Sequence, residues 1–463
     1  MGFLRAEIFI PLRYRNYFLL WTGQGMHAFA LWGEQIARPF LIFAMVPDIK
    51  QAAIHLGFVI AVRTLPQLFF GVFAGVVSDW FDRRMILVLT KAAVLVLSLA
   101  FAAALLLGRA ELWHYYVFSF LRGSFMAFDQ PARQAMIPTI VPTSQMTRAI
   151  ALMSGTQNLM RIAGASAAGF SIWLLGIPGT FLAVAVIYAP ALIATYLIRN
   201  APQERQSETG ARAMGRGLVE GARFAWTSEP IRGVLLISLV YFTFGMSYIQ
   251  VFAPIFAEQI LQVGSQGLGV MVSFTGAGAL FGAFLVAHRQ PVRVGLLLPV
   301  TVMAFGGMLV AFAASTYLPA STPSALRLGV PFMLMGLTGI LQTAFFSMSN
   351  AALLAAAPPR MRGRVVSLLS LDRAMVTLGA SLAGFLTAFQ GVRLAQIEFG
   401  LICVAGGLAV LFLVPALREA RMQGGRGFAS DEDYAESTEA AQEAEDAEAE
   451  RQARTATASK ARA

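Results

Sequence analysis

The sequence predicts an all-α polytopic membrane protein, with twelve transmembrane helices in two pseudo-symmetric six-helix bundles. Its 463 residues are 57% hydrophobic and only 13% charged, whereas soluble domains carry about 25% charged residues. Twelve apolar stretches are each long enough to cross a bilayer, which takes about 20 residues of helix. A glycine motif in the first half of the chain recurs in the second half, which favours two related bundles.

The loops between the predicted spans carry unequal numbers of basic residues. The predicted spans are residues 17–45, 53–77, 85–107, 113–136, 146–173, 178–199, 231–257, 266–287, 294–315, 328–355, 365–389 and 395–416. One side has nineteen Lys and Arg, among them Lys91, and the other has only Lys50, Arg109, Arg327 and Arg393. The positive-inside rule therefore places both termini in the cytoplasm, and it explains the net charge of +10 without nucleic acid binding.

A long polar loop divides the spans six and six. The predicted organisation is an N-terminal bundle at 1–199, a cytoplasmic central loop at 200–230, a C-terminal bundle at 231–417 and a tail at 418–463. The tail alternates alanine with acidic residues, a composition that cannot bury a core, so we expect it to be disordered.

Four polar residues of the first span lie on one helical face: Gln24, His27, Glu34 and Arg38. Glu34 is near the middle of its span, where an acid is costly and is commonly functional. Under one interpretation, Glu34 and Arg38 form a structural pair that neutralises itself. Under the other, Glu34 exchanges a proton with a central wet cavity and Arg38 tunes that exchange. The residues alone leave both interpretations open.

The connection between the second and third spans concentrates charge in a short turn. Gly71 and Gly75 allow close helix packing, and the charged residues of the turn are Asp79, Asp82, Arg83 and Arg84. Two arginines in a cytoplasmic loop follow from the positive-inside rule, but the acids do not. We therefore predict a conformational latch made of Gly75, Asp79, Asp82, Arg83 and Arg84, in which an acid bonds a helix end or an arginine and releases it in a second conformation.

Other ionisable and polar residues within the spans are candidates for coupling and for a substrate cavity. The proton-coupling candidates are Glu34, Arg38, Arg122 and Asp372. The substrate-cavity candidates are Gln24, His27, Arg63, Asn158, Arg161, Tyr241, Gln342 and Arg373. A cavity lined by arginines suits an anionic or polyphenolic ligand. Asp129 is expected to be structural, neutralising Arg133 or Arg148.

The glycine repeat reads Gly164-Ala-Ser-Ala-Ala-Gly169-Phe in the first half and Gly379-Ala-Ser-Leu-Ala-Gly384-Phe in the second. Because small residues let helix backbones approach closely, Gly164, Gly169, Gly379 and Gly384 are predicted helix-packing positions. The repeat places the fifth and eleventh spans at equivalent positions in the two bundles.

The chain resembles the major facilitator superfamily, and more narrowly its bacterial branch of drug and siderophore (enterobactin-type) exporters. The resemblance rests on the latch turn, on residues 11–21 and 127–138, and on Asn158-Leu-Met-Arg161-Ile-Ala-Gly164-Ala165, where Ala165 replaces the usual proline. It implies a proton-coupled exporter of amphipathic small molecules that works by alternating access in the bacterial cytoplasmic (inner) membrane. The alternatives are an importer or lysophospholipid flippase of the same fold, or a receptor or accessory protein that does not transport.

The sequence contains no nucleotide-binding loop, no metal-ligand cluster and no nucleophile–base constellation. We therefore expect no enzymatic activity, no cofactor and no metal. The expected partners are a small-molecule substrate, protons and the lipid bilayer, with no nucleic acid, and the protein is expected to be monomeric.

Overall fold

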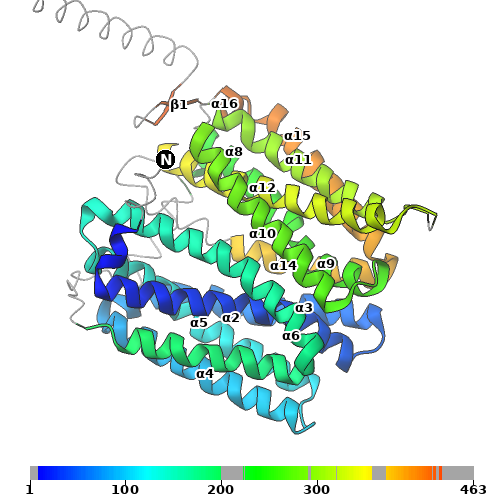
Figure 1. Cartoon of the computed structure of the whole chain (residues 1–463). Helices are drawn as coiled ribbons and strands as arrows, with labels where there is room; N and C mark the ends of the chain where they lie inside the picture. Colours follow the sequence, from blue (N-terminus) through cyan, green and yellow to red (C-terminus); the bar gives the residue numbers. More distant parts are fainter. Residues whose placement is uncertain are drawn as a thin grey trace, which may run out of the picture.

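The computed structural model describes residues 9–199, 223, 225–289, 293–319, 321–356, 372–419, 421–423 and 427–429. Its helices form two bundles, with the first half of the chain in one and the second half in the other (Figure 1). The first contains η1 (Ile10–Arg13), α2 (Arg15–Met45), α3 (Ile49–Trp80), α4 (Arg83–Leu106), α5 (Leu112–Ile140), η2 (Thr143–Gln145) and α6 (Met146–Tyr196).

The second bundle begins with a helix that contains three π-helical segments. The segments of that helix are α8 (Glu229–Val240), η3 (Tyr241–Gly245), η4 (Tyr248–Phe252), α9 (Ala253–Ile255) and η5 (Phe256–Ile260). The helices that follow are α10 (Gly264–Arg289), α11 (Val294–Ser315), α12 (Ser324–Ala356), α14 (Asp372–Gln390), α15 (Val392–Leu413) and α16 (Pro415–Glu419).

Eight of the described helices are long and apolar enough to cross a membrane. One of them is α6, which bends at Gly176, where φ is 69° and only glycine is comfortable, so that it supplies two crossings. Helices α2 and α5 carry more polar residues, and α14 has a shorter apolar stretch at Ala374–Gln390; these three complete the two bundles. Large apolar side chains face outward along the helices, including Phe389, which is 83% exposed, and Leu413, which is 77% exposed. The prediction of an all-α polytopic membrane protein is confirmed.

The repeated glycines make equivalent contacts in the two bundles. Gly164 packs on the carbonyl of Phe29 in α2, and Gly379 packs on the carbonyl of Thr243 in η3, each within its own bundle. The second glycine of each motif instead packs on the other bundle: Gly169 meets the Ser265 carbonyl in α10, and Gly384 meets the Ala53 carbonyl in α3. A Cβ atom at any of the four positions would overlap the facing backbone. The motif therefore follows the pseudo-two-fold symmetry.

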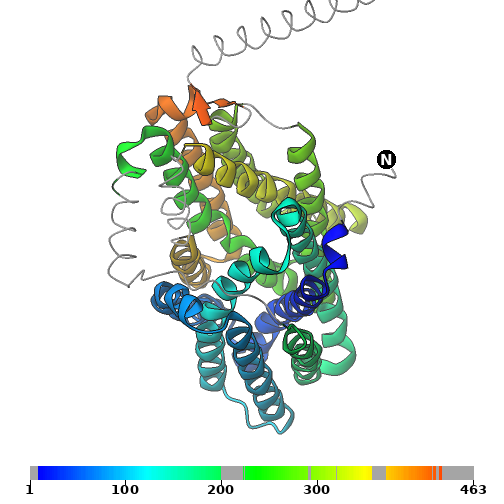
Figure 2. The same ribbon diagram turned by 90° about the vertical axis from the view of Figure 1, so that its left-hand side faces the viewer.

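The two bundles meet along two helix pairs, α6 with α10 and α3 with α14 (Figure 2). Ser166 Oγ lies 2.6 Å from Ser273 Oγ, and Ser265 Oγ donates to the Gly169 carbonyl at 3.1 Å. These contacts, like those of Gly169 and Gly384, lie toward the end of the molecule whose loops contain few basic residues. The described contacts between the bundles thus close the predicted outer end.

The described helices and strands extend past the predicted start of the tail. The predicted tail began at 418, but α16 continues to Glu419, and Arg421–Gln423 pairs antiparallel with Gly427–Ala429 in a small two-stranded sheet. Backbone pairing beside α11 and α12 therefore orders residues that composition alone assigned to the tail. The acidic part of the tail, most of the central loop and residues 357–371 lie outside the described residues.

Candidate functional site

An acid–arginine centre lies inside the first bundle. Glu34 of α2 forms an ion pair with Arg122 of α5, and Arg38 Nη2 lies 3.9 Å from Glu34 Oε1. Glu34 and Arg122 are 2% and 1% exposed. Arg122 also donates to the hydroxyl of Tyr188 in α6 at 2.5 Å and lies over the rings of Phe118 and Tyr188. One interpretation made Arg38 the structural partner of Glu34 and the other made it a neighbour that tunes proton exchange; neither included the ion pair with Arg122 of another helix.

This centre contains more hydrogen-bond donors than it uses. Arg38 Nε and Nη2 and Arg122 Nε are buried and make no hydrogen bond among the described residues. The Gln24 side-chain oxygen and both ring nitrogens of His27 are also buried without a hydrogen bond in this part of the chain. Since an unsatisfied buried polar group costs about 1–3 kcal/mol, such a concentration is typical of a site that binds a ligand, a proton or water.

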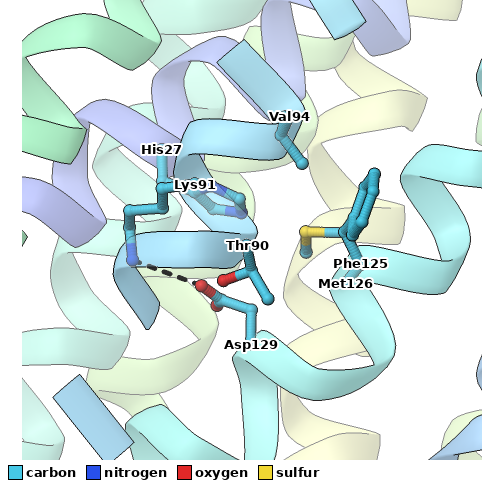
Figure 3. Close-up of a pocket in the computed structure, with 7 residues that line it drawn as sticks. All are labelled: His27, Thr90, Lys91, Val94, Phe125, Met126 and Asp129. Carbon is cyan, nitrogen blue, oxygen red and sulfur yellow. Dashed lines mark hydrogen bonds and ion pairs between the residues drawn. The ribbon is translucent and has the colours of Figure 1, made fainter. Parts of the chain in front are cut away.

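A second charged cluster surrounds Asp129 of α5. Lys91 Nζ of α4 lies 3.2 Å from Asp129 Oδ1 (Figure 3). Arg133 Nε, also of α5, lies 3.3 Å from Asp129 Oδ2. His27, Thr90 and Lys91 line a small pocket beside this acid. The structure agrees with the expected Asp129–Arg133 pair. Lys91 was counted among the loop residues, which is wrong: it is 2% exposed inside α4.

The two bundles are joined by a hydrogen bond between two of the predicted cavity residues. Arg161 Nη1 of α6 donates to Gln342 Oε1 of α12 at 3.0 Å, and the Arg161 guanidinium lies 5.0 Å from the ring centre of Trp32. Arg161 also interacts electrostatically with Tyr241 and Tyr248, which face it from the π-helical segments.

Buried donors without a hydrogen bond are concentrated at this junction as well. They are Arg161 Nε and Nη2 and the hydroxyls of Tyr241 and Tyr248; within the described residues these hydroxyls lie near Gln342 and near Arg161, Thr338 and Thr275 without reaching hydrogen-bond geometry. Both tyrosines lie in π-helical segments, which are wider than α-helical turns and are often found at functional sites. The π-helical backbone at Tyr241–Gly245 and Tyr248–Phe252 therefore directs the two rings toward the junction. Tyr241 packs against Phe345, with ring centres 4.2 Å apart.

The other predicted cavity residues do not join the cluster around Arg161 in the described part of the structure. Asn158 Nδ2 donates to the Ser154 carbonyl of its own helix. Arg63 is half-buried and is repelled electrostatically by Arg38. The side chains of Asp372 and Arg373 lie outside the described part of the structure. The structure therefore brings together Arg161, Tyr241 and Gln342, and adds Tyr248 and Trp32.

The predicted latch turn is two residues long, between Trp80 and Arg83. Asp82 caps α4 by accepting a hydrogen bond from the Arg84 amide at 2.9 Å. Arg83 donates to the Ala135 carbonyl at 2.9 Å, and Arg84 donates to the Tyr196 carbonyl at 2.6 Å. The arginines therefore tie the turn to the ends of α5 and α6. The side chains of Gly75 and Asp79 are not among those described, so the role of the latch stays a prediction.

Known proteins with related sequences are bacterial transporters. The multidrug efflux pump Tap of Mycobacterium tuberculosis (strain ATCC 25618 / H37Rv) is 26% identical over 401 residues, which is 83% of this chain and 90% of that protein. The staphyloferrin A transporter of Staphylococcus aureus (strain NCTC 8325 / PS 47) is 23% identical over 344 residues, covering 73% of this chain and 82% of that protein.

The fold is shared with solved transporter structures. A crystal structure of a POT family transporter in complex with a thioalcohol-conjugated peptide superimposes with a TM-score of 0.69 at 13% identity, covering 87% of this chain and 96% of that one. The family model described as transmembrane secretion effector matches residues 6–435, nearly all of the membrane-spanning part. The chain therefore belongs to the transmembrane secretion effector family of major facilitator superfamily transporters and is a transporter rather than an enzyme.

Proposed function

We propose that this transporter exports amphipathic small molecules that carry an anionic group, by proton-coupled alternating access. The observation that carries the proposal is the Arg161–Gln342 contact between the bundles, surrounded by buried donors that have no hydrogen bond. A carboxylate or phenolate would satisfy the arginine and the two tyrosine hydroxyls, and the facing Phe345 and Trp32 rings would accept its apolar part. Efflux by the related Tap protein is consistent with this direction of transport.

The balance of buried charge supports an anionic ligand. The buried charged residues among those described are the acids Glu34 and Asp129 and the bases Arg38, Lys91, Arg122, Arg133 and Arg161. Bases exceed acids, and an uncompensated buried charge is costly. An anion that enters the site would reduce that cost, whereas a cation would increase it.

Proton coupling is assigned to Glu34. A proton taken up by this acid from the outer side would weaken its attraction for Arg122 and Arg38, and release of the proton to the cytoplasm would restore those ion pairs. The substrate binds at the Arg161 junction and leaves to the outer side while Glu34 is ionised, and the protonated protein returns without substrate to the inward-facing state. Export of the substrate and entry of the proton are coupled because each is carried in only one of the two directions.

The orientation of the protein in the membrane is part of the proposal. The distribution of basic loop residues supports placement in the bacterial inner membrane with both termini in the cytoplasm, where we propose that the protein acts as a monomer. Outward opening must then break the outer contacts at Ser166–Ser273 and at Gly384. The latch turn would hold the inner ends of α5 and α6 during that change.

The test uses three related dyes in inverted membrane vesicles, in which export appears as uptake. Dansyl-glycine is anionic, dansyl-glycinamide is neutral and dansylcadaverine is cationic. An imposed pH gradient should drive accumulation of the anionic dye, and a protonophore should abolish it. Arg161→Gln should lower the initial rate about tenfold, because one charge-assisted hydrogen bond contributes roughly 1.5–3 kcal/mol, whereas Arg109→Gln, outside the site, should not.

The outcomes separate the parts of the proposal. If none of the dyes accumulates above vesicles that lack the protein, the transport assignment is wrong. If dansylcadaverine accumulates and dansyl-glycine does not, transport stands and the anionic preference is wrong. Uptake in right-side-out vesicles only would identify an importer.

A further inference from the structure

A polar cavity of about 320 Å³ lies in the second bundle, apart from the buried centres described above. It forms where η5 and α11 end and where α12 and α15 begin, at the predicted outer end of the bundle. Its lining residues are Ile260, Leu261, Ser315, Thr316, Leu318, Ser324, Arg327, Leu328 and Arg393.

The lining has a strongly positive character. It contains two arginines, Arg327 and Arg393, and three hydroxyl side chains, but no acidic residue. Hydroxyls and guanidinium groups together are typical partners of phosphate and carboxylate groups. The lining therefore fits an anion and disfavours a cation.

Arg393 is held in position for such a ligand. Its Nε donates to Thr316 Oγ1 at 3.0 Å and its Nη2 donates to the Thr316 carbonyl at 2.9 Å. The guanidinium also lies 4.4 Å from the ring centre of Tyr317. These contacts use two of the five N–H groups of an arginine and fix its plane, so little side-chain entropy is lost when a ligand binds the others.

The position of the two arginines is unusual for this chain. Only four basic residues lie in loops or helix ends on the predicted outer side, and two of them line this one cavity. Basic residues on the outer side oppose the positive-inside rule, so topology does not explain them. Binding of an anion at this point does explain them.

The cavity is amphipathic and of limited size. Leu318 and Leu328 give it an apolar wall, and the neighbouring Tyr317 and Leu326 are 59% and 54% exposed where the helix ends meet the membrane surface. A volume of about 320 Å³ is at the lower end of the range for small-molecule sites. It therefore suits a phosphate head group with its glycerol carbons rather than a drug-sized molecule.

We propose that this cavity binds the phosphate head group of an anionic phospholipid from the adjacent leaflet. Arg327 and Arg393 hold the phosphate oxygens, the Ser324 hydroxyl donates to them, and the leucines contact the glycerol carbons. Basic pockets between transmembrane helices on the cytoplasmic or matrix side bind anionic lipid head groups, and we propose the same chemistry for this cavity at the outer end. The inference is independent of which substrate the protein transports.

The test measures lipid binding to the full-length protein by native mass spectrometry. Palmitoyl-oleoyl phosphatidylglycerol should bind at least tenfold more tightly than palmitoyl-oleoyl phosphatidylcholine. Arg327→Gln should reduce the phosphatidylglycerol affinity on the order of tenfold, and Arg327→Gln with Arg393→Lys should remove the preference for it. Arg109→Gln, which removes an outer-side arginine that does not line the cavity, should leave the preference intact.

Two results would overturn the proposal. Unchanged phosphatidylglycerol affinity in Arg327→Gln, a variant of an exposed side chain that should fold normally, would show that the lipid binds elsewhere. Displacement of the lipid by glycerol 1-phosphate at equal concentration would show that the cavity takes a soluble phosphate ester instead.

Discussion

The two bundles share one helical plan but bury different chemistry. The first buries five basic and two acidic side chains among the described residues, at Glu34–Arg122, around Asp129 and at Arg161. The buried polar groups described in the second are hydroxyls and amides, such as Thr275, Gln342 and Gln396. The repeat kept the glycine contacts that position the helices, while the buried charged side chains among those described all belong to the first bundle. The coupling that we propose would therefore act through the charges of the first bundle, whereas the second bundle places aromatic rings such as Tyr241 and Phe345 beside the junction.

The largest effect on stability is expected at Asp129. Asp129→Leu leaves Lys91 and Arg133 buried without their acid, which should lower the free energy of unfolding by about 3–5 kcal/mol. Adding Lys91→Met should recover part of that loss, because the two residues are coupled. Thr275→Val, which alters a buried polar group of the second bundle, should cost about 1 kcal/mol.

Denaturant titration of the purified variants in micelles would measure these differences. If Asp129→Leu and Thr275→Val lowered the free energy of unfolding equally, the distinction between a bundle with buried charges and a bundle without them would be contradicted. A double variant that is no more stable than Asp129→Leu would show that Lys91 is not the principal partner.

The next effect concerns the closed outer end. A valine at Gly384 would overlap the Ala53 backbone. It should separate α14 from α3 at the outer end and destabilise the closed conformation by about 1–3 kcal/mol. Gly71→Val is the matched control, because no atom lies within 4 Å of a Cβ at Gly71. Closure can be measured by replacing Ser166 and Ser273, whose hydroxyls are 2.6 Å apart, with cysteines in a Cys403→Ala background. The yield of the disulfide between the two new cysteines then reports the fraction of molecules that are closed.

Gly384→Val should reduce that yield and Gly71→Val should not. If both variants crosslink as the parent does, Gly384 does not control closure of the outer end.

The fold was largely predictable from the sequence because the signals were long and repeated. Apolar runs defined the helices, and the motif at Gly164 and Gly379 identified the two bundles before any contact was known. The break at Gly176 falls in the gap between the predicted spans 146–173 and 178–199. The π-helical segments were not predicted, since single-turn changes leave no clear periodic signal.

The candidate site was predictable in part. Spacing put Glu34 and Arg38 on one helical face, but the partner Arg122 is on a distant helix, and no spacing within one chain segment reveals a tertiary ion pair. Lys91 had a usable signal, because it lies several residues inside the span predicted at 85–107. Tyr188 and Trp32 carried no charge and therefore could not be distinguished from packing residues.

A smaller effect tests the latch turn. Asp82 and Asp48 both cap a helix by accepting from the amide two residues on, at 2.9 and 3.0 Å, so Asp82→Ala and Asp48→Ala should each cost about 1 kcal/mol of stability. If Asp82 also acts as a latch, its variant should slow dye accumulation more than the Asp48 variant does. Equal rates would limit Asp82 to capping.

The most direct test of the central claim compares coupling in the two bundles. Glu34→Gln should abolish uphill accumulation of dansyl-glycine driven by a pH gradient, while exchange of the dye down its own gradient continues, because the proton site is lost but the arginines remain. Gln396→Leu, which removes a buried hydrogen bond of the second bundle, should leave uphill accumulation at the parent rate. Uphill accumulation at the parent rate in Glu34→Gln would contradict the account.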